Sequence, residues 1–196
     1  MAAGPDVRVV RPRARSLLSR WRRDDSGATA VEFAIIALPF MMLMFGIMTV
    51  CLYFFTNFSL ENAAWAAARS VRTGQMQQGT GAYTGAMTLE DRKTAFKAAL
   101  CSKAPTFLNC AGKVVVIVQS NASFGGITKP TCAVNGTLIN QSAAAFDTGG
   151  ASSVVLVTVC YPWEFANQLP FLKFGTLNNG AALMQASVTF RTEPYQ

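Results

Sequence analysis

A long uncharged apolar run lies near the N-terminus of this chain. From Phe33 to Leu60 there are 28 residues without a formal charge, and Glu32 is the only Asp, Glu, Lys or Arg between Asp25 and Glu61. As a helix this run is about 42 Å long, because each residue adds about 1.5 Å. About 20 apolar residues suffice to cross the hydrocarbon core of a bilayer. No later run reaches that length, so the sequence predicts one transmembrane helix, which Pro39 kinks because it lacks an N–H.

Basic residues are concentrated before this run. Residues 1–27 hold seven Arg and three Asp, a net of +4 out of +7 for the whole chain. The pI near 9.5 is typical of nucleic-acid-binding proteins, but a basic block beside an apolar span indicates a membrane surface instead. The positive-inside rule places the N-terminus in the cytoplasm and the rest of the chain outside. The lipid bilayer is therefore an expected partner and nucleic acid is not.

The composition excludes several classes of function. The chain is 51% hydrophobic, which excludes intrinsic disorder. Only 14% of its residues are charged, whereas a soluble domain carries about 25% charged residues, so the composition argues against a wholly soluble chain. It has no histidine, so Ser-His-Asp and Cys-His hydrolases are excluded and the commonest zinc ligand is missing. The carboxylates show no paired spacing typical of acid–base catalysis. We therefore expect no enzyme activity, no catalytic residue, no cofactor and no metal.

A short motif stands where the apolar run begins. Gly27 precedes the run, and the sequence then continues as Ala28-Thr29-Ala30-Val31-Glu32-Phe33. This motif resembles the prepilin peptidase site of type IV pilin-like proteins, in which cleavage follows the glycine and the glutamate becomes the fifth residue of the mature chain. With the early Pro39 and the Ala-rich stretch 62–69, it resembles the TadE-like proteins of Tad (tight adherence, Flp-type) pili. The resemblance is specific over residues 20–72 and weaker over 101–196.

This resemblance implies a function and a set of partners. It implies a minor pilin or pseudopilin, cut between Gly27 and Ala28, that acts in pilus initiation, assembly or tip structure. The expected partners are the prepilin peptidase, other Tad pilins and pseudopilins, and the inner-membrane assembly platform. The expected location is the bacterial inner membrane, with a periplasmic C-terminal domain, and after assembly the extracellular pilus. The alternative is an uncleaved single-span inner-membrane protein with a periplasmic binding domain, which the size of the membrane form would distinguish.

Glu32 is the candidate assembly residue. An ionised carboxylate costs about 2.5 to 3.5 kcal/mol at the centre of a membrane helix and less near the interface, so such a residue normally has a partner. Cleavage after Gly27 would give Ala28 a free α-amino group, and the amine of a neighbouring subunit could pair with Glu32 and set the stagger between helices. The alternative is that Glu32 only reaches water at the interface.

The rest of the chain predicts an α+β fold with three parts. These are a basic cytoplasmic leader (1–27), a transmembrane helix with an Ala-rich extension (28–72) and a small periplasmic domain with an antiparallel sheet and one or two helices (73–196). Residues 73–86 are rich in Gly, Gln and Thr, which is typical of a loop. A helix is predicted over Leu89–Cys101, where Thr88 and Asp91 resemble a capping box. Strands are predicted over 113–118, 153–159 and 184–191, with a weak strand near 133–139.

Four of the five cysteines lie in the exported part. Cys51 falls in the apolar span and is expected to be free. An even number of cysteines in an oxidising compartment predicts two disulfides. The preferred pairing is Cys101–Cys110, across a short loop, with Cys132–Cys160; a pairing of Cys110 with Cys160 is the alternative.

An aromatic-rich stretch follows the second predicted strand. It contains Tyr161, Trp163, Phe165, Phe171 and Phe174. Packing in the core and in loops would explain it, and a contact surface for a partner subunit is the second interpretation.

Overall fold

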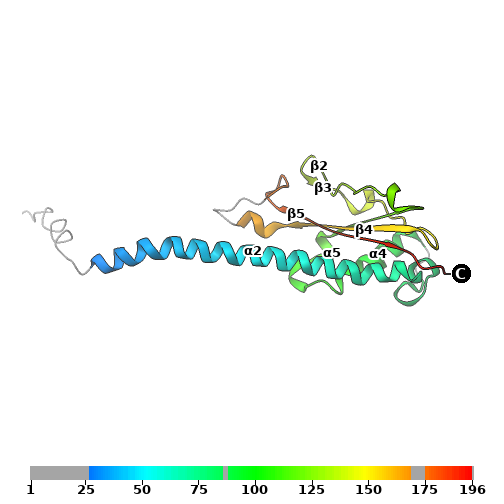
Figure 1. The fold of residues 1–196 in the computed structure, drawn as a ribbon, viewed down its shortest axis with the longest axis horizontal. Helices are drawn as coiled ribbons and strands as arrows, with labels where there is room; N and C mark the ends of the chain where they lie inside the picture. The colour runs from blue at the N-terminus through cyan, green and yellow to red at the C-terminus, as the bar shows by residue number, and fades with distance from the viewer. Residues whose placement is uncertain (1–26, 86–87, 169–174, 196) are drawn as a thin grey trace, which may run out of the picture. The chain divides into compact units, whose positions relative to one another are not determined.

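The computed structural model describes residues 27–85, 88–168 and 175–195 (Figure 1). Its longest element is helix α2, which spans Ala28–Arg72 and continues through Pro39. The chain divides into two compact units at Met48/Thr49. The first unit contributes the N-terminal part of α2, and the second contains the rest of α2 and the whole α+β domain. The arginine-rich leader, Phe171 and Phe174 lie outside the described residues.

The N-terminal part of α2 presents apolar side chains on all sides. Between Ala28 and Met48 only Ala37 and Gly46 are half-buried, and every other residue is exposed. In the described part of the chain, α2 is the one helix long and apolar enough to cross a membrane. A helix that is apolar all round needs either a protein interior or a bilayer to cover it. Among the described residues of its own unit nothing covers this helix, in agreement with the predicted span.

The domain is built on a three-stranded antiparallel sheet in the order β1-β4-β5. The strands are β1 (Val115–Asn121), β4 (Val154–Trp163) and β5 (Ala182–Arg191). This confirms the predicted α+β class and all three longer strands. Their ends differ from the prediction: β1 begins two residues later, and β4 continues four residues further.

The extension of β4 passes through Pro162, which a central strand normally excludes because proline cannot donate to the ladder. Strand β1 begins at Val115, opposite Cys160, so among the described residues no strand lies on that side of Pro162. On the other side Pro162 faces Leu183 of β5. The N–H of Leu183 donates to Thr176 Oγ1 at 2.9 Å, so this pair exchanges no ladder hydrogen bond. Pro162 therefore stands where β4 needs no donor.

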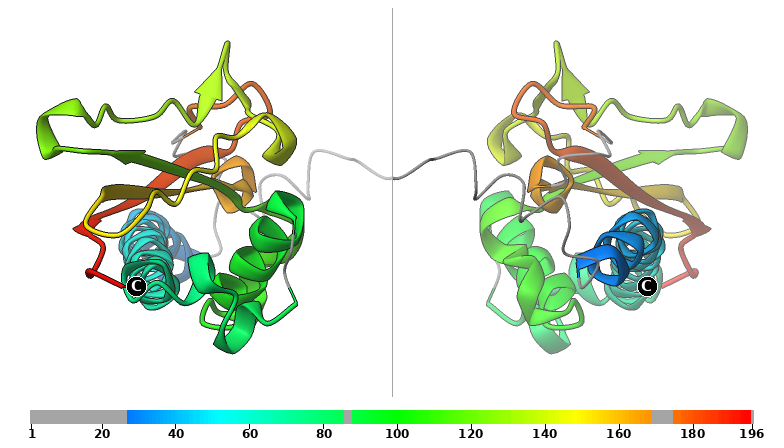
Figure 2. Two further views of the ribbon diagram at one scale, coloured as in Figure 1. Left: turned by 90° about the vertical axis from the view of Figure 1, so that its right-hand side faces the viewer. Right: turned by 90° about the vertical axis from the view of Figure 1, so that its left-hand side faces the viewer.

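The described α-helices of the domain lie on one face of the sheet (Figure 2). They are α2 from Thr49 onward, the short α3 (Gln75–Gln78), α4 (Leu89–Cys101) and the short α5 (Cys110–Lys113). Helix α4 has the predicted bounds and starts with a complete capping box, in which the Asp91 N–H donates to Thr88 Oγ1 and the Thr88 N–H donates to Asp91 Oδ2. The predicted loop 73–86 contains α3 and a 3-10 turn (Gly81–Tyr83).

The Ala-rich part of α2 forms the contact with the sheet. Its buried residues recur every three or four positions and are Leu60, Ala63, Ala64, Ala67, Ala68 and Val71. They share one hydrophobic cluster with alternate residues of β4, such as Val157 and Val159. Alanines let the helix approach the sheet closely, because their side chains end at Cβ. The composition of this stretch therefore follows from packing within the domain.

Enlarging one of these alanines should destabilise the domain. Ala67 is 3% exposed, so Ala67→Leu has no room and should lower the free energy of unfolding by about 1 to 3 kcal/mol. Ala66 is exposed on the same turn, and Ala66→Leu should stay within about 0.5 kcal/mol of the parent. Denaturant titration of the full chain in detergent, followed by tryptophan fluorescence, measures both. Equal effects of the two substitutions would contradict this packing.

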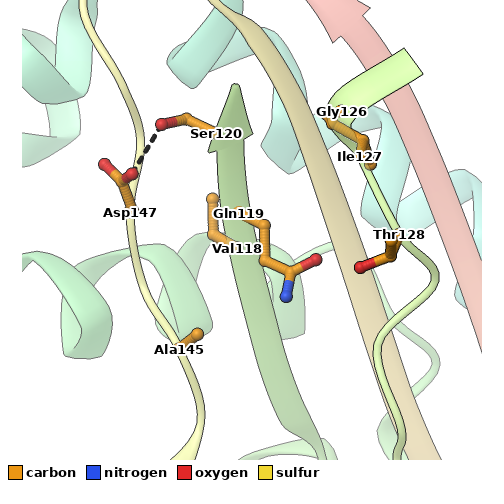
Figure 3. Close-up of a pocket in the computed structure, with 8 residues that line it drawn as sticks. All are labelled: Val118, Gln119, Ser120, Gly126, Ile127, Thr128, Ala145 and Asp147. Atoms are coloured by element: carbon orange, nitrogen blue, oxygen red, sulfur yellow. Dashed lines mark hydrogen bonds between the residues drawn. The ribbon is translucent and has the colours of Figure 1, made fainter. Parts of the chain in front are cut away.

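The segment between β1 and β4 covers part of the opposite face. It contains a small hairpin of β2 (Ala133–Val134) and β3 (Thr137–Leu138). Its two-residue turn, Asn135-Gly136, has positive φ at both positions, as a type I′ turn requires. A second apolar cluster forms beneath the segment from Val115, Ile117, Cys132, Ala144 and Cys160. Beside it, a groove of about 300 Å³ lies over β1, between residues 126–128 and 145–147 (Figure 3).

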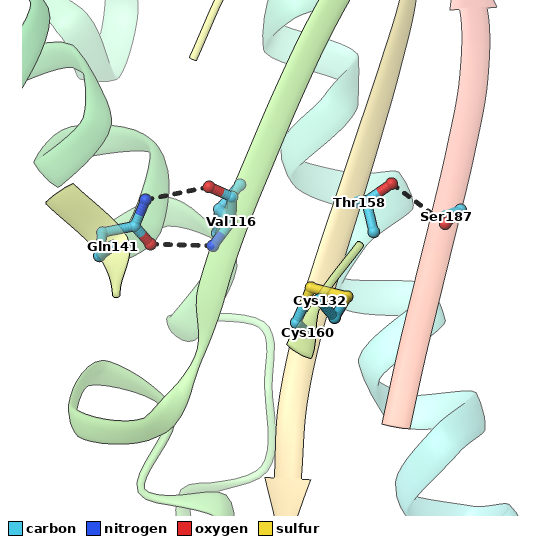
Figure 4. Close-up of a disulfide and its surroundings, with 6 residues drawn as sticks. All are labelled: Val116, Cys132, Gln141, Thr158, Cys160 and Ser187. Atoms are coloured by element: carbon cyan, nitrogen blue, oxygen red, sulfur yellow. Dashed lines mark hydrogen bonds between the residues drawn. A yellow bond between two sulfur atoms is a disulfide. The ribbon is translucent and has the colours of Figure 1, made fainter. Parts of the chain in front are cut away.

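The outer edge of β1 is closed by a side chain rather than by a strand (Figure 4). The N–H of Val116 donates to Gln141 Oε1 at 2.8 Å, and Gln141 Nε2 donates to the Val116 carbonyl at 2.9 Å. Further along, the N–H of Val118 donates to the Ala145 carbonyl and the N–H of Asp147 donates to the Val118 carbonyl, each at 2.9 Å. The side-chain amide of Gln141 thus makes the two hydrogen bonds that a peptide group of a neighbouring strand would make with buried Val116.

Truncating Gln141 should therefore lower the free energy of unfolding, mainly through the loss of its two hydrogen bonds to Val116. Gln141→Ala leaves the N–H and carbonyl of buried Val116 without partners, which costs about 1 to 3 kcal/mol. The control is Ser142→Ala at the exposed next position, for which we expect a change within about 0.5 kcal/mol. Chemical denaturation compares the two variants. A Gln141→Ala protein as stable as the control would show that the bridge contributes nothing.

Candidate functional site

The residues of the predicted cleavage site lie at the start of α2. Gly27 is exposed and directly precedes the first helical residue, Ala28. A Cβ added at Gly27 would have no described atom within 4 Å, apart from its chain neighbours. A larger side chain at this position would therefore meet no obstacle in the described part of its own chain. Any loss of processing in a bulky variant would reflect the fit to the peptidase.

Glu32 lies slightly more than one turn after Ala28, on the same side of the helix. Its side chain and that of Phe33 are exposed. Residues four apart on a helix are neighbours, so Glu32 stands close to the position where cleavage would create a new amine. The ion pairs among the described residues are Arg72–Glu193, Lys93–Glu90 and Lys113–Glu164. None of them includes Glu32, whose carboxylate has no ion-pair partner among the described residues.

In the part of α2 that belongs to the domain, several large apolar side chains remain exposed. Phe54, Phe58 and Trp65 are all exposed, and their spacing of four and seven residues places them on one side of the helix. We call these three residues the outer stripe of α2. They are not among the residues predicted from the sequence, although their helical spacing is a usable signal. The alanine face of α2 binds the sheet, and the outer stripe remains open.

The structure contains both disulfides of the preferred pairing. Cys101 at the end of α4 is bonded to Cys110 at the start of α5, and Cys132 is bonded to Cys160. The latter bond ties the β1–β4 segment to the centre of the sheet (Figure 4). The alternative pairing fails because Cys110 lies in the cluster on the helix side and Cys160 in the cluster on the other face. Cys51 is free and exposed.

The groove over β1 offers one polar pair. Ser120 Oγ donates to Asp147 Oδ2 at 2.5 Å, and the other lining residues are mostly small or aliphatic (Figure 3). A serine and a carboxylate without an imidazole lack the base that activates a nucleophile in a triad. Across the described residues, no group of three or more His, Cys, Asp or Glu side chains could hold a metal ion.

Two groups with shifted pKa values have structural roles. Burial raises the pKa of Tyr83 above its ordinary value, against the opposing effect of a 2.8 Å hydrogen bond between its hydroxyl and that of Ser70. That bond ties the 3-10 turn Gly81–Tyr83 to the end of α2. The hydrogen bonds from Thr88 lower the pKa of Asp91, which caps α4. Both shifts follow from packing and capping.

Comparison with known proteins gives one finding. Residues 27–69 match the family model of TadE-like proteins, and no curated protein and no solved structure matches the chain. The matched segment begins at the glycine of the predicted cleavage site and ends within the alanine face of α2. TadE-like proteins are structural components of Tad pili rather than enzymes. The segment from Gly27 to Arg69 is thus TadE-like, as the motif at the start of the apolar run predicts, and it indicates a membrane-anchored protein associated with Tad pili.

Proposed function

We propose that this protein is a minor pilin or pseudopilin of a Tad-type pilus, cut by the prepilin peptidase between Gly27 and Ala28. The observation that carries the proposal is the TadE-like helix itself, which starts directly after an exposed glycine and leaves its apolar surface uncovered. Its mature form would comprise the helix 28–72 and the domain 73–196. That domain is large for a subunit that only fills a shaft, which favours a role in initiation or at the tip.

The proposed site works in two steps. Before assembly, α2 anchors the chain in the inner membrane, with the leader in the cytoplasm and the disulfide-bonded domain in the oxidising periplasm. On assembly, α2 transfers from lipid to a bundle of similar helices. The exposed residues of its first part and the outer stripe then pack against neighbouring helices. Glu32 pairs with the new amine of an adjacent subunit and sets the stagger.

The outer stripe gives a direct test in cells that carry the pilus system. A photoreactive benzoylphenylalanine in place of Phe58, which is 64% exposed, should crosslink to other Tad pilins only when the prepilin peptidase is active. The same group in place of Phe124, which is 62% exposed in the segment after β1, is the control for random collisions. Equal capture of pilins from both positions, or capture at Phe58 without the peptidase, would favour the uncleaved binding protein.

A further inference from the structure

Aromatic side chains from three separate parts of the chain meet at one end of the domain. Tyr53 packs edge-on against Trp163 with ring centroids 5.4 Å apart, and Trp163 contacts Phe165 at 5.6 Å. Phe55 stacks on Phe107 at 6.2 Å. We call these five residues the aromatic cluster. Phe107 and Phe165 each lie on a short 3-10 helix, Thr106–Leu108 and Glu164–Gln168.

The sheet shows which end of the domain this is. The N–H of Glu193, just after β5, donates to the carbonyl of Arg72 at 2.9 Å, so the end of β5 lies at the C-terminal end of α2. Ala182, where β5 begins, pairs with Trp163 at the end of β4. Trp163 in turn contacts Tyr53, nineteen residues before Arg72 on α2. The aromatic cluster is therefore at the end of the domain where α2 enters it, just after Thr49.

The position of the cluster along α2 coincides with the expected edge of the bilayer. The uncharged run begins at Phe33, and about 20 residues cross the hydrocarbon core, so the far boundary falls at about Leu52. The cluster starts at the next residue. Aromatic side chains are enriched at this depth in membrane proteins, where their rings lie at the level of the lipid headgroups.

Three members of the cluster are open to their surroundings: Phe55 on α2, which is 55% exposed, and the two phenylalanines on the 3-10 helices. Phe107 is 57% exposed and Phe165 is 40% exposed, whereas Trp163 is buried. A groove of about 300 Å³ joins Phe107 and Phe165, and its charged residues, Lys113 and Glu164, form an ion pair with each other. The open surface is thus apolar with its charges paired, and it continues the exposed apolar surface of α2 at Phe54 and Phe55.

We propose that the aromatic cluster docks the domain on the bilayer that α2 spans, with Phe107 and Phe165 inserted at the outer headgroup boundary. This rests on the membrane insertion of α2 in the proposed function. The docked surface would hold the domain against the membrane before assembly, and the transfer of α2 into a pilus would have to release it. The commitment to lipid follows from the depth of the cluster and from its continuity with the apolar span.

The test uses the full chain, one copy per nanodisc of phosphatidylethanolamine and phosphatidylglycerol. Benzoylphenylalanine replaces Phe107, Phe165, Phe40 or Phe124 in separate variants, and intact mass after illumination reports covalent lipid adducts. All four positions are exposed, so the larger side chain should not disturb folding, and the protection of Cys101, Cys110, Cys132 and Cys160 from thiol reagents checks that the fold is kept. Phe124 follows the end of β1 that pairs with Val154, which is the end of the domain far from the cluster.

The four positions separate the two claims. We expect lipid adducts at Phe40, Phe107 and Phe165, severalfold above the level at Phe124. Adducts at Phe40 alone would overturn the docking of the domain and leave the membrane helix in place. No adduct at Phe40 would overturn the membrane insertion and the docking together. Crosslinks from Phe107 and Phe165 to protein instead of lipid would assign the cluster to a subunit contact and overturn the proposal.

Discussion

Removing the Cys132–Cys160 disulfide should destabilise the domain more than removing Cys101–Cys110. The two bonds join residues 28 and 9 positions apart, and the chain-entropy model gives losses of about 3.6 and 2.6 kcal/mol for loops of these lengths. The positions of the two bonds predict the same order of stability losses. Cys132–Cys160 holds the β1–β4 segment on the sheet, whereas Cys101–Cys110 joins α4 to the nearby α5.

The measurement is denaturant unfolding of the full chain in detergent. Each pair is replaced by alanine, which avoids leaving serine hydroxyls buried at the two sites. Cys51→Ala is the control, and because Cys51 is free and exposed we expect a change within about 0.5 kcal/mol. If the Cys101/Cys110 variant proved the less stable of the two, loop closure would not be the dominant contribution of these bonds.

Replacing Glu32 by glutamine should abolish most assembly while leaving insertion and cleavage intact. In a packed bundle the Glu32 carboxylate loses water and needs a cation, which the amine at Ala28 of a neighbouring subunit would supply. Coulomb attraction at 4 Å is about 4 kcal/mol at an effective dielectric of 20, and desolvation offsets much of it. If the net contribution of the pair is about 1.4 kcal/mol, its loss lowers the affinity of one subunit contact tenfold. The same loss occurs at every subunit contact in the assembly.

Glu61→Gln provides the matched control. Glu61 is also an exposed carboxylate on α2, but it lies after the uncharged run. Both variants should reach the membrane and begin at Ala28, and only Glu32→Gln should fail to co-purify with the other pilins. If Glu32→Gln associates as well as the parent, Glu32 is only an interfacial residue.

Most of the secondary structure of the domain follows from local patterns. The alternation in β5 and the capping residues Thr88 and Asp91 carried enough information to place a strand and a helix. The Asn135-Gly136 pair is a hairpin signal, yet this region was predicted only as a weak strand. The end of β4 could not be predicted, because Pro162 is acceptable only where β4 has no hydrogen-bonded neighbour in β1. Which residues of β4 lack that neighbour depends on the pairing of residues far apart in sequence.

The functional residues likewise fall into those that a local motif identifies and those whose roles depend on tertiary contacts. Gly27 and Glu32 form a local motif, so the sequence alone identifies them, and the TadE-like match begins at the same glycine. Gln141 and Phe107 carry no local signal. Gln141 matters because the fold brings its amide to the open edge of Val116, and Phe107 because the fold brings it to Phe55. Side chains whose roles arise from tertiary contacts are the part that periodicity and spacing do not reveal.

The N-terminus of the membrane form shows whether the prepilin peptidase cuts this chain after Gly27. Intact mass and N-terminal sequencing of the protein extracted from membranes should show a chain that begins at Ala28 in cells with the prepilin peptidase. It should begin ahead of Gly27 in cells without the peptidase and in a Gly27→Trp variant. A chain that retains residues 1–27 in the presence of the peptidase, or one cut at any other position, would show that the protein is not processed as a pilin.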